Sequence, residues 1–425
     1  MAIGDSLIKI WQHKDLRARI FYVFGLLVMA RILAHIPLPG VDLESLRTFF
    51  SRNQLFGLLD MFSGGTMSNF SIVLMGVGPY ITASIIMQLL GVVIPSLEAL
   101  QKEGEWGQRK LNQYTRWLTI PMAIVQAFGM ISLLRSQGAV NIDWNFFNMA
   151  VILISTTGGT ILLMWLGELI SENGIGNGIS LIITLGIIAG FPSQIRNTLA
   201  VVDTTKIIGL IILAVIAVLT VLFIVVVTEG ERRVPVAYAR RIVGRRSYGG
   251  VETHLPIRVN VAGVIPIIFA MSIMLFPSTL AKFLEQARSA WLANAASWTS
   301  RLFQNNLFYG IMYFILVVGF TFFYTAIVFK PQQVAENLQK QGGFIPAIRP
   351  GQQTSQYLDF VLKRITLAGA IFLGIIAVLP FIVQAATSIK TLVIGGTGLL
   401  IIISVIIDTM RNIQSQLLMR TYEQY

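Results

Sequence analysis

Three ionisable side chains interrupt or border the apolar stretches of the sequence, and each is of a type that can carry protons or ions. Arg31 lies inside an apolar stretch, while Glu168 and Asp408 lie close to the ends of two others. Ionisable residues within membrane spans typically mark ion pathways or proton relays. Three scattered positions do not form a relay, and side chains near a span end can reach the membrane surface. The sequence therefore gives no positive sign of proton-coupled transport, although it does not exclude it.

Other catalytic and metal-binding residue sets are missing from the sequence. There is no Cys, and the three His residues, His13, His35 and His254, are far apart along the chain. Without Cys, no thiolate zinc site, iron–sulfur cluster or disulfide framework is possible. The zinc-protease, phosphate-loop and nucleophile-elbow motifs are also absent. We therefore predict that the chain is not an enzyme and has no metal site and no cofactor.

The apolar stretches themselves indicate a protein that crosses a membrane many times. Of 425 residues, 55% are hydrophobic and only 12% are charged, whereas ordinary soluble domains carry about 25% charged residues. This composition excludes a soluble enzyme, a disordered chain and a coiled coil. A helix needs about 20 mainly apolar residues to cross a bilayer. Ten such spans are predicted, at residues 20–36, 70–94, 117–134, 149–170, 179–191, 207–228, 259–281, 307–329, 365–384 and 391–409.

Basic residues are distributed unevenly between the two sides of these spans. Ten spans place both termini on the same side, and that side carries 22 of the 32 Lys and Arg residues, against 9 on the other side. Cytoplasmic loops of membrane proteins are enriched in Lys and Arg. We therefore expect both termini to be cytoplasmic.

A short motif occurs twice, five spans apart. Residues 76–83 (GVGPYITA) and 263–270 (GVIPIIFA) both follow the pattern Gly-Val-x-Pro-x-Ile-x-Ala. An odd number of spans in each half inverts the second half relative to the first, as in proteins with a path between inverted repeats. We therefore expect an N-terminal half, 1–200, with spans 1–5, and a C-terminal half, 201–425, with spans 6–10.

Residues 55–62 form an apolar stretch that is too short to cross a bilayer. It is followed by Ser63, Gly64 and Gly65, on the side opposite the termini. One interpretation is a helix that lies on the membrane surface. The other is a re-entrant segment that fills a cavity, with the two glycines as a hinge.

The predicted cytoplasmic loop 229–258 carries seven Arg and no Lys. Its residues alternate from Val234 to Tyr238, which predicts a strand. The tip of a β-hairpin would then lie at residues 244–246, with a return strand near Tyr248.

The predicted cytoplasmic loop 330–364 contains a Gly- and Pro-rich stretch, 342–351, which predicts a non-helical shape that presents Arg349. One interpretation of the basic residues in both loops is orientation charge and contact with lipid headgroups. The rigid fork of Arg also suits protein carboxylates or RNA phosphates. This second interpretation favours partner docking through Arg245, Arg246 and Arg349.

These stretches resemble the SecY family, the channel subunits of the bacterial Sec protein translocase. The resemblance extends nearly from end to end, and its motifs occur in the same order as in the family. The matching stretches are 61–65 (MFSGG), 78–81 (GPYI), 102–105 (KEGE), 164–168 (MWLGE), 174–180 (GIGNGIS), 253–256 (THLP), 262–266 (AGVIP), 322–326 (FFYTA) and 348–351 (IRPG).

The resemblance implies an all-helical polytopic fold with ten transmembrane helices in two inverted five-helix halves. It also implies a central constriction made of aliphatic side chains and a short re-entrant plug helix that closes it. The plug would lie at about 55–69 and include Phe62, Ser63, Gly64 and Gly65. Carried over by position, the ring would be Val77, Ile81, Ile183, Ile268 and Ile401. Val77 departs from the family, which usually has the larger Ile at this position.

A lateral gate to the lipid is implied between the second and seventh spans. Thr82, Gln126 and Ser272 are polar candidates along this seam. Hydroxyl groups inside helices also commonly bond to their own backbone, which is the alternative interpretation.

The function implied by the resemblance is a passive protein-conducting channel in the bacterial plasma membrane. It would translocate unfolded secretory proteins and release membrane-protein helices sideways into the lipid. Because the chain has no nucleotide-binding motif, the driving force must come from partners, which the resemblance implies are the SecA ATPase or a ribosome. Other implied partners are the SecE and SecG membrane subunits, signal peptides, nascent chains and anionic lipids. The alternative is a secondary transporter with inverted repeats, which should place polar groups at the membrane midplane.

Overall fold

The computed structural model describes residues 13–38, 46, 60, 63–136, 138, 140, 145–201, 207–238, 241–243, 246–248, 252–284, 289–387 and 396–423. Most of these residues are helical. The helices are α2 (Lys14–Leu33), α5 (Gly78–Val93), α6 (Pro95–Lys102), α7 (Glu105–Ser136), α8 (Phe146–Asn173), α9 (Gly178–Val201), α10 (Ile207–Glu229), α11 (Ile265–Leu284), α12 (Ala290–Gln304), α13 (Asn306–Val328), α14 (Pro331–Lys340), α15 (Gln352–Thr387) and α16 (Gly396–Glu423). The strands are β1 (Glu231–Tyr238), β2 (Arg241–Val243), β3 (Arg246–Tyr248), β4 (Glu252–Arg258) and β5 (Gly343–Phe344).

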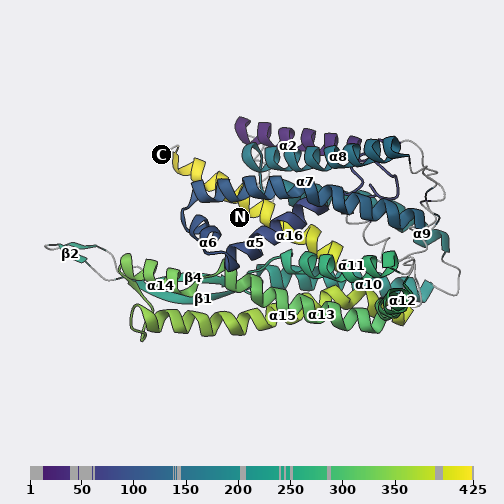
Figure 1. Cartoon of the computed structure of the whole chain (residues 1–425). Helices are drawn as coiled ribbons and strands as arrows, with labels where there is room; N and C mark the ends of the chain where they lie inside the picture. The colour runs from purple at the N-terminus through teal and green to yellow at the C-terminus, as the bar shows by residue number, and fades with distance from the viewer. Residues whose placement is uncertain are drawn as a thin grey trace.

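The long helices run side by side in two groups, with α16 passing between them (Figure 1). One group contains α2, α7 and α8, and the other contains α11, α13 and α15. The buried apolar residues follow the same division. One hydrophobic cluster uses only residues between 38 and 153, and a second uses only residues between 224 and 403. A third cluster joins residues of both groups and lies where they meet.

Among the described residues, each of the ten predicted spans overlaps one long helix: α2, α5, α7, α8, α9, α10, α11, α13, α15 or α16. Of these described helices, α7, α8, α13, α15 and α16 are long and apolar enough to cross a bilayer by themselves. α5 and α6 form a sixth candidate, bent by 101° at their junction. The helices support a protein that crosses the membrane several times, and the number of ten crossings stays a prediction.

The second and seventh spans were predicted to begin too early, because their first residues are not helical. Each of the two helices, α5 and α11, has Pro at its second position, Pro79 or Pro266. Proline has no N–H, and the first turn of a helix is where it is accommodated best. The glycines that precede them, Gly76 and Gly263, have φ of +54° and +63°. This left-handed conformation interrupts a right-handed helix, so the apolar residues just before it are not helical.

Other helices extend well beyond the predicted spans. α7 begins at Glu105, twelve residues before the predicted start, and α15 begins at Gln352, thirteen residues before it. α9 continues to Val201, beyond the predicted end at residue 191. Hydropathy identifies only the apolar part of a helix, whereas these ends contain many polar residues.

The predicted hairpin in loop 229–258 is confirmed, but the strand that returns along β1 is β4 and not a strand near Tyr248. Tyr248 ends β3, which pairs with β2 in a separate two-stranded sheet. β1 pairs with β4 from Glu231 opposite Arg258 to Ala237 opposite Glu252. The side chains of Val234 and Val236 are buried, as the alternation predicted. β5 pairs with the other edge of β1 and gives the strand order β4-β1-β5. The sequence analysis missed β5, a two-residue strand.

The non-helical stretch predicted in loop 330–364 is also confirmed, but it is shorter than the loop. α14 precedes it and α15 follows it, so most of the loop is helical. Ile345 and Leu358 are buried against the sheet in a small separate core. This core gives the predicted cytoplasmic loops a fixed shape.

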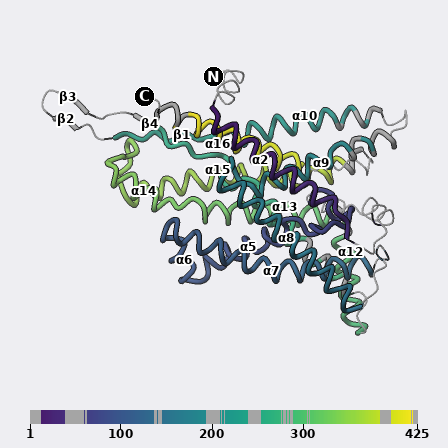
Figure 2. Tube along the Cα trace, turned by 90° about the horizontal axis from the view of Figure 1, so that it is seen from above, coloured from purple at the N-terminus to yellow at the C-terminus, as the bar shows by residue number. Residues whose placement is uncertain are grey.

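The first and last described helices have their outer ends at the same end of the molecule. α2 begins, and α16 ends, at the end that carries β1, β4 and α14 (Figure 1, Figure 2). α12 lies at the opposite end. This arrangement agrees with the prediction that both termini lie on one side.

Candidate functional site

The five residues predicted to form a pore ring lie together in one hydrophobic cluster, which we call the central cluster. Val77, Ile183 and Ile401 are buried in it, and Ile81 and Ile268 pack against it. These residues come from the start of α5 and from α9, α11 and α16, and they are more than 300 positions apart at the extremes. The buried members of the central cluster are Leu26, Ala30, Ala34, Val73, Val77, Leu163, Leu166, Ile170, Ile182, Ile183, Ile187, Ile401 and Val405.

The starts of α5 and α11 position their aliphatic residues in the same way. The Ile81 N–H donates to the Val77 carbonyl at 3.1 Å, so these two side chains lie one turn apart on one face. The Ile268 N–H donates to the Val264 carbonyl at 3.4 Å in the corresponding turn of α11. The repeated motif therefore places two aliphatic side chains from each copy at the central cluster.

Val264 is a residue of this site that the sequence analysis missed. It packs against the central cluster, as Ile268 does. It also has the same place in its motif copy as Val77, since both directly follow the left-handed glycine. The repeated motif was the signal that could have identified it.

Of the predicted plug residues, Phe62 lies outside the described residues, and Ser63, Gly64 and Gly65 are described. Gly64 and Gly65 have φ of +78° and +79°, a conformation that glycine adopts without strain. The Asp60 carbonyl accepts hydrogen bonds from the Gly65 N–H at 2.8 Å and from Ser63 Oγ at 2.9 Å. The Asp60 Oδ1 accepts the Ser68 N–H at 2.8 Å. These bonds fix a tight turn.

The turn of the predicted plug lies directly against α9. A Cβ atom on Gly64 would lie 2.7 Å from the Cα of Gly186, and one on Gly186 would lie 2.9 Å from the Cα of Gly64. Only two glycines allow the backbones to approach so closely. Gly186 is three residues after Ile183, which is about one helical turn. The predicted plug and the predicted ring are therefore neighbours.

The predicted gate residues are only partly brought together. Gln126 Nε2 donates to Thr82 Oγ1 at 3.2 Å, which joins α7 to α5. The Thr82 hydroxyl in turn donates to the Gly78 carbonyl at 3.1 Å. The Ser272 hydroxyl donates to the Ile268 carbonyl of its own helix at 2.9 Å, as the alternative interpretation expected. α7 packs against both α5 and α11, which touch each other only sparsely.

The three ionisable residues at the predicted spans all have partners within the protein. Arg116 Nε donates to Glu168 Oε1 at 2.6 Å and joins α7 to α8. Asp408 Oδ1 lies 3.8 Å from Arg258 Nη1, between α16 and β4. Arg31 Nη1 donates to the Gly64 carbonyl at 2.6 Å. Protein contacts therefore account for these charges, and reaching the membrane surface is not needed to explain them.

The predicted docking residues are described to different extents. Arg245 lies outside the described residues, and Arg246 begins β3 opposite Val243. Arg349 is exposed and follows a tight turn in which the Ile348 N–H donates to the Ile345 carbonyl at 3.1 Å. Thr354 Oγ1 donates to the Arg349 carbonyl at 2.9 Å. The backbone of Arg349 is thus held from both sides.

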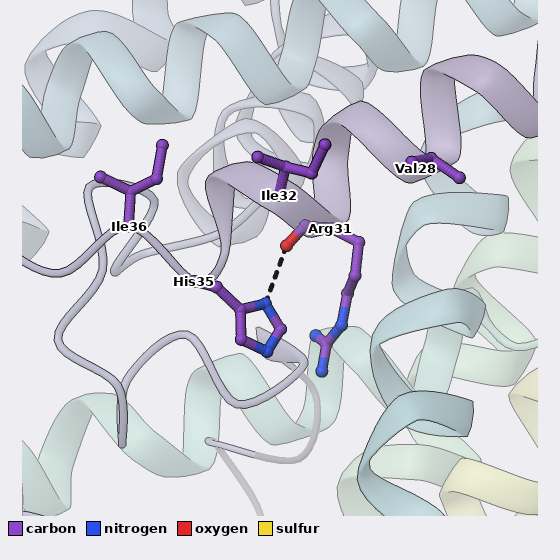
Figure 3. Close-up of a pocket in the computed structure, with 5 residues that line it drawn as sticks. All are labelled: Val28, Arg31, Ile32, His35 and Ile36. Atoms are coloured by element: carbon purple, nitrogen blue, oxygen red, sulfur yellow. Dashed lines mark hydrogen bonds between the residues drawn. The ribbon is translucent and has the colours of Figure 1, made fainter.

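The end of α2 carries a shallow hollow of about 460 Å³. It is lined by Val28, Arg31 and Ile32 of α2 and by His35 and Ile36 just beyond the helix end. The side chains of Arg31 and His35 point to one side, while those of Ile32 and Ile36 point to the other (Figure 3). His35 Nδ1 lies 2.9 Å from the Arg31 carbonyl. Within the described part of the chain, no group of three or more His, Cys, Asp or Glu residues could hold a metal ion.

Comparisons with known proteins identify the family. The SecY family model matches residues 71–410. The protein translocase subunit SecY of Streptomyces coelicolor is 43% identical over 428 residues, which cover 96% of each chain. The subunit SecY of Mycobacterium tuberculosis strain H37Rv is 42% identical, again with 96% of each chain covered.

Solved structures show the same fold. One described as a protein-conducting channel has a TM-score of 0.62 and 20% identity, and covers 93% of this chain and 91% of that chain. Sec61 in a canine ribosome–channel complex has a TM-score of 0.57 and 19% identity, with the same shares covered. The relatives are named as translocase subunits and not as enzymes, which agrees with the prediction that the chain is not an enzyme. Together, the family match and these identities show that the chain belongs to the SecY family of protein translocase subunits.

Proposed function

We propose that this chain is the protein-conducting channel of a Sec translocase and that the central cluster contains its constriction. The observation that carries the proposal is that four separate helices, α5, α9, α11 and α16, bring five aliphatic residues into one cluster: Val77, Ile81, Ile183, Ile268 and Ile401. The alternative of a secondary transporter has no support, because the relatives are protein translocase subunits. The central cluster is also aliphatic where a transporter would need polar groups.

An aliphatic constriction suits the task of passing many different protein segments while holding back ions. Polar or charged rings bind ions, whereas a narrow apolar neck gates by losing its water. Branched aliphatic side chains also form no fixed hydrogen bonds, so they favour no particular passing sequence. The burial of Val77, Ile183 and Ile401 supports a sealed state in this structure.

The segment around Ser63, Gly64 and Gly65 is proposed to be the plug that closes this constriction. The close approach of Gly64 to Gly186, one turn from Ile183, supports this role. Sideways release of helices into the lipid would occur where α5 and α11 separate. The sparse contact between these helices supports a seam there, and the bond from Gln126 to Thr82 would help to keep it closed.

Partners would dock on the end that carries the sheet. Arg349 stands on a fixed and exposed turn, and Arg245 and Arg246 lie at the tip of the hairpin by sequence. We assign these three to docking of the SecA ATPase or the ribosome, one of the solved relatives being a ribosome-bound channel. SecE and SecG would complete the complex, signal peptides and nascent chains would be its cargo, and anionic lipids would surround its basic face.

This docking role predicts a charge-specific defect. Arg349→Glu should abolish SecA-driven transport of preproteins into vesicles, because it removes an attraction and adds a repulsion. Lys340→Glu makes the same charge change on an exposed residue of the neighbouring α14 and serves as the matched control. Normal transport by the Arg349 variant would contradict the assigned role.

The chain would lie in the bacterial plasma membrane with both termini in the cytoplasm. The excess of 22 basic residues on one side over 9 on the other supports this orientation. α2 begins and α16 ends at the same end of the molecule, which supports this orientation as well (Figure 1).

Cross-linking to a translocating chain tests the proposed function. The protein has no Cys, so single Cys residues at positions 81, 183 and 268 can be cross-linked to a Cys in a stalled preprotein. Val92 and Ile273, exposed apolar residues on the same helices, give the matched control positions. We expect adducts at the three ring positions and few at the controls. Equal or greater yields at the control positions would refute the pathway.

A further inference from the structure

Arg31 is a charged residue placed where charge is costly. It lies on α2 between Ala30 and Ala34, both of which are buried in the central cluster. A charged side chain within a membrane span costs several kcal/mol in isolation, so such residues pair with a partner and commonly have a functional role. The role of Arg31 should therefore be found in what its guanidinium contacts.

The guanidinium reaches the predicted plug. Arg31 Nη1 donates a hydrogen bond of 2.6 Å to the carbonyl of Gly64, which is 33 positions away in the sequence. Hydrogen bonds from a charged donor are shorter and stronger than those between neutral groups. The Asp60 carboxylate, on the other side of the same turn, also attracts the guanidinium. Arg31 thus interacts with two groups of the turn, one on each side of Ser63.

The side chains of Asp60, Ser63 and Ser68 bond within the turn itself, whereas Arg31 bonds to the turn from another helix. Gly64 and Gly65 have no side chains, and Gly64 needs this absence because it touches Gly186. Glycine also gives the chain the greatest conformational freedom once the turn is released. A bond from α2 to the Gly64 carbonyl is therefore an effective way to hold this turn against α9, which it contacts through the backbone of Gly64.

We propose that Arg31 is the latch of the plug, a positioning residue whose bond to the Gly64 carbonyl forms only while the plug is seated. This proposal rests on the proposed function, since it assumes that the turn at Ser63–Gly65 closes a channel. A contact made in only one of two states shifts the equilibrium toward that state. Arg31 therefore favours the closed channel without lining the pathway of the passing chain.

The absence of Cys allows a direct measurement of plug seating. In the complex reconstituted in vesicles, Ser63→Cys gives a single thiol at the turn. The readout is the rate at which a membrane-impermeant maleimide labels this thiol from the plug side of the membrane. Arg31→Gln should raise the labelling rate about tenfold, the effect of losing one charge-assisted hydrogen bond. An unchanged rate in a correctly assembled Arg31→Gln complex would overturn the proposal.

Arg19→Gln is the matched control. It makes the same change on the same helix, twelve residues earlier and so about 18 Å along its axis. Its labelling rate should equal that of the parent. If Arg19→Gln raised the labelling rate as much as Arg31→Gln, the effect would come from a change in α2 as a whole, and the proposed role of Arg31 would be wrong.

Two milder variants keep the test decisive if Arg31→Gln does not assemble. Arg31→Lys keeps the charge but loses the planar fork, and Asp60→Asn keeps an acceptor for the Ser68 N–H but loses the attraction to Arg31. Each should raise the rate a few-fold. Parent rates in both variants would overturn the latch.

The double variant Ile81→Ser with Ile268→Ser separates the two proposals. If this double variant leaks ions while the thiol in Arg31→Gln is labelled as slowly as in the parent, the channel assignment stands and the proposed role of Arg31 is wrong. If neither variant changes leakage or labelling, the assignment of the constriction fails as well.

Discussion

The two copies of the repeated motif fold alike at their own residues and differ in what surrounds them. In each copy, a left-handed glycine is followed by a valine and by a helix with proline at its second position. The alanines that end the two motifs, Ala83 and Ala270, are both fully buried. The same local structure therefore forms in both copies, and in each copy it places aliphatic side chains at the central cluster.

The surroundings of the two glycines are not alike. A Cβ atom on Gly76 would lie 3.8 Å from Ser63, whereas one on Gly263 would have no neighbour within 4 Å. The second copy has Asn260 instead, whose Nδ2 donates to the Gly263 carbonyl at 3.2 Å. The difference teaches that both copies supply the framework of the proposed constriction, while the turn at Ser63, which we propose to be the plug, lies beside the first copy only as far as these two glycines show.

The largest effect is expected at the contact between Gly64, in the proposed plug beside the first copy, and Gly186 of α9. Gly186→Val adds a branched side chain against Gly64, where even a Cβ would lie 2.9 Å from its Cα. Overpacking of this kind costs about 1–3 kcal/mol, which corresponds to roughly 5- to 150-fold in the closed–open equilibrium. We expect ion leakage to rise by a factor in this range, measured as dye or ion flux from vesicles.

Gly319→Val is the control for this variant. It makes the same substitution on α13, at a glycine where a Cβ would meet nothing within 4 Å. It should leave leakage unchanged. A seal as tight in Gly186→Val as in Gly319→Val would show that the contact with Gly64 does not hold the channel closed.

A second effect, on stability, should be equal in the two copies. Ala83→Leu and Ala270→Leu each force a larger side chain into a fully buried position. Each should lower the free energy of unfolding by about 1–3 kcal/mol. Thermal unfolding of the purified complex measures this, with Ala326→Leu on the exposed face of α13 as control. A large loss in only one of the two variants would break the equivalence of the motifs.

The smallest effect is expected at the polar residues of the proposed gate, where Gln126 and Ser272 should differ. Gln126→Leu removes the bond to Thr82, and a net hydrogen bond is worth about 0.5–1.5 kcal/mol. It should allow preproteins with weak signal sequences to be transported several-fold better. Ser272→Ala removes only a bond within one helix and should have little effect. If Ser272→Ala had the larger effect, the assignment of the gate bond to α5 and α7 would be wrong.

The sequence predicts the framework of this protein well because its strongest signals are local. Hydropathy locates the apolar helices, and alternation predicts β1. Hydropathy predicts the wrong helix start where apolar residues are buried without being helical. Phe70 and Leu74, in the turns before Gly78, are two such residues. Hydropathy also misses the polar ends of α7 and α15, because it does not register them.

Within the candidate site, the predicted ring residues were found by resemblance. The repeat alone would have given three of them, Val77, Ile81 and Ile268, together with Val264. Val264 was missed although its motif position matches that of Val77. The bond from Arg31 to Gly64 could not be predicted, since no periodicity links residues 33 positions apart. Such long-range contacts depend on how α2, α9 and the turn at Gly64 pack together.

Single-channel conductance in planar bilayers tests the central claim most directly, namely that the two motif copies supply one constriction. Ile81→Ser with Ile268→Ser removes one branched side chain from each copy, and Val92→Ser with Ile273→Ser makes matched changes at exposed positions of the same helices. We predict that the first double variant shows resting ion currents while the second stays closed, because a polar neck no longer excludes water. A first variant as silent as the parent at equal insertion would contradict the account.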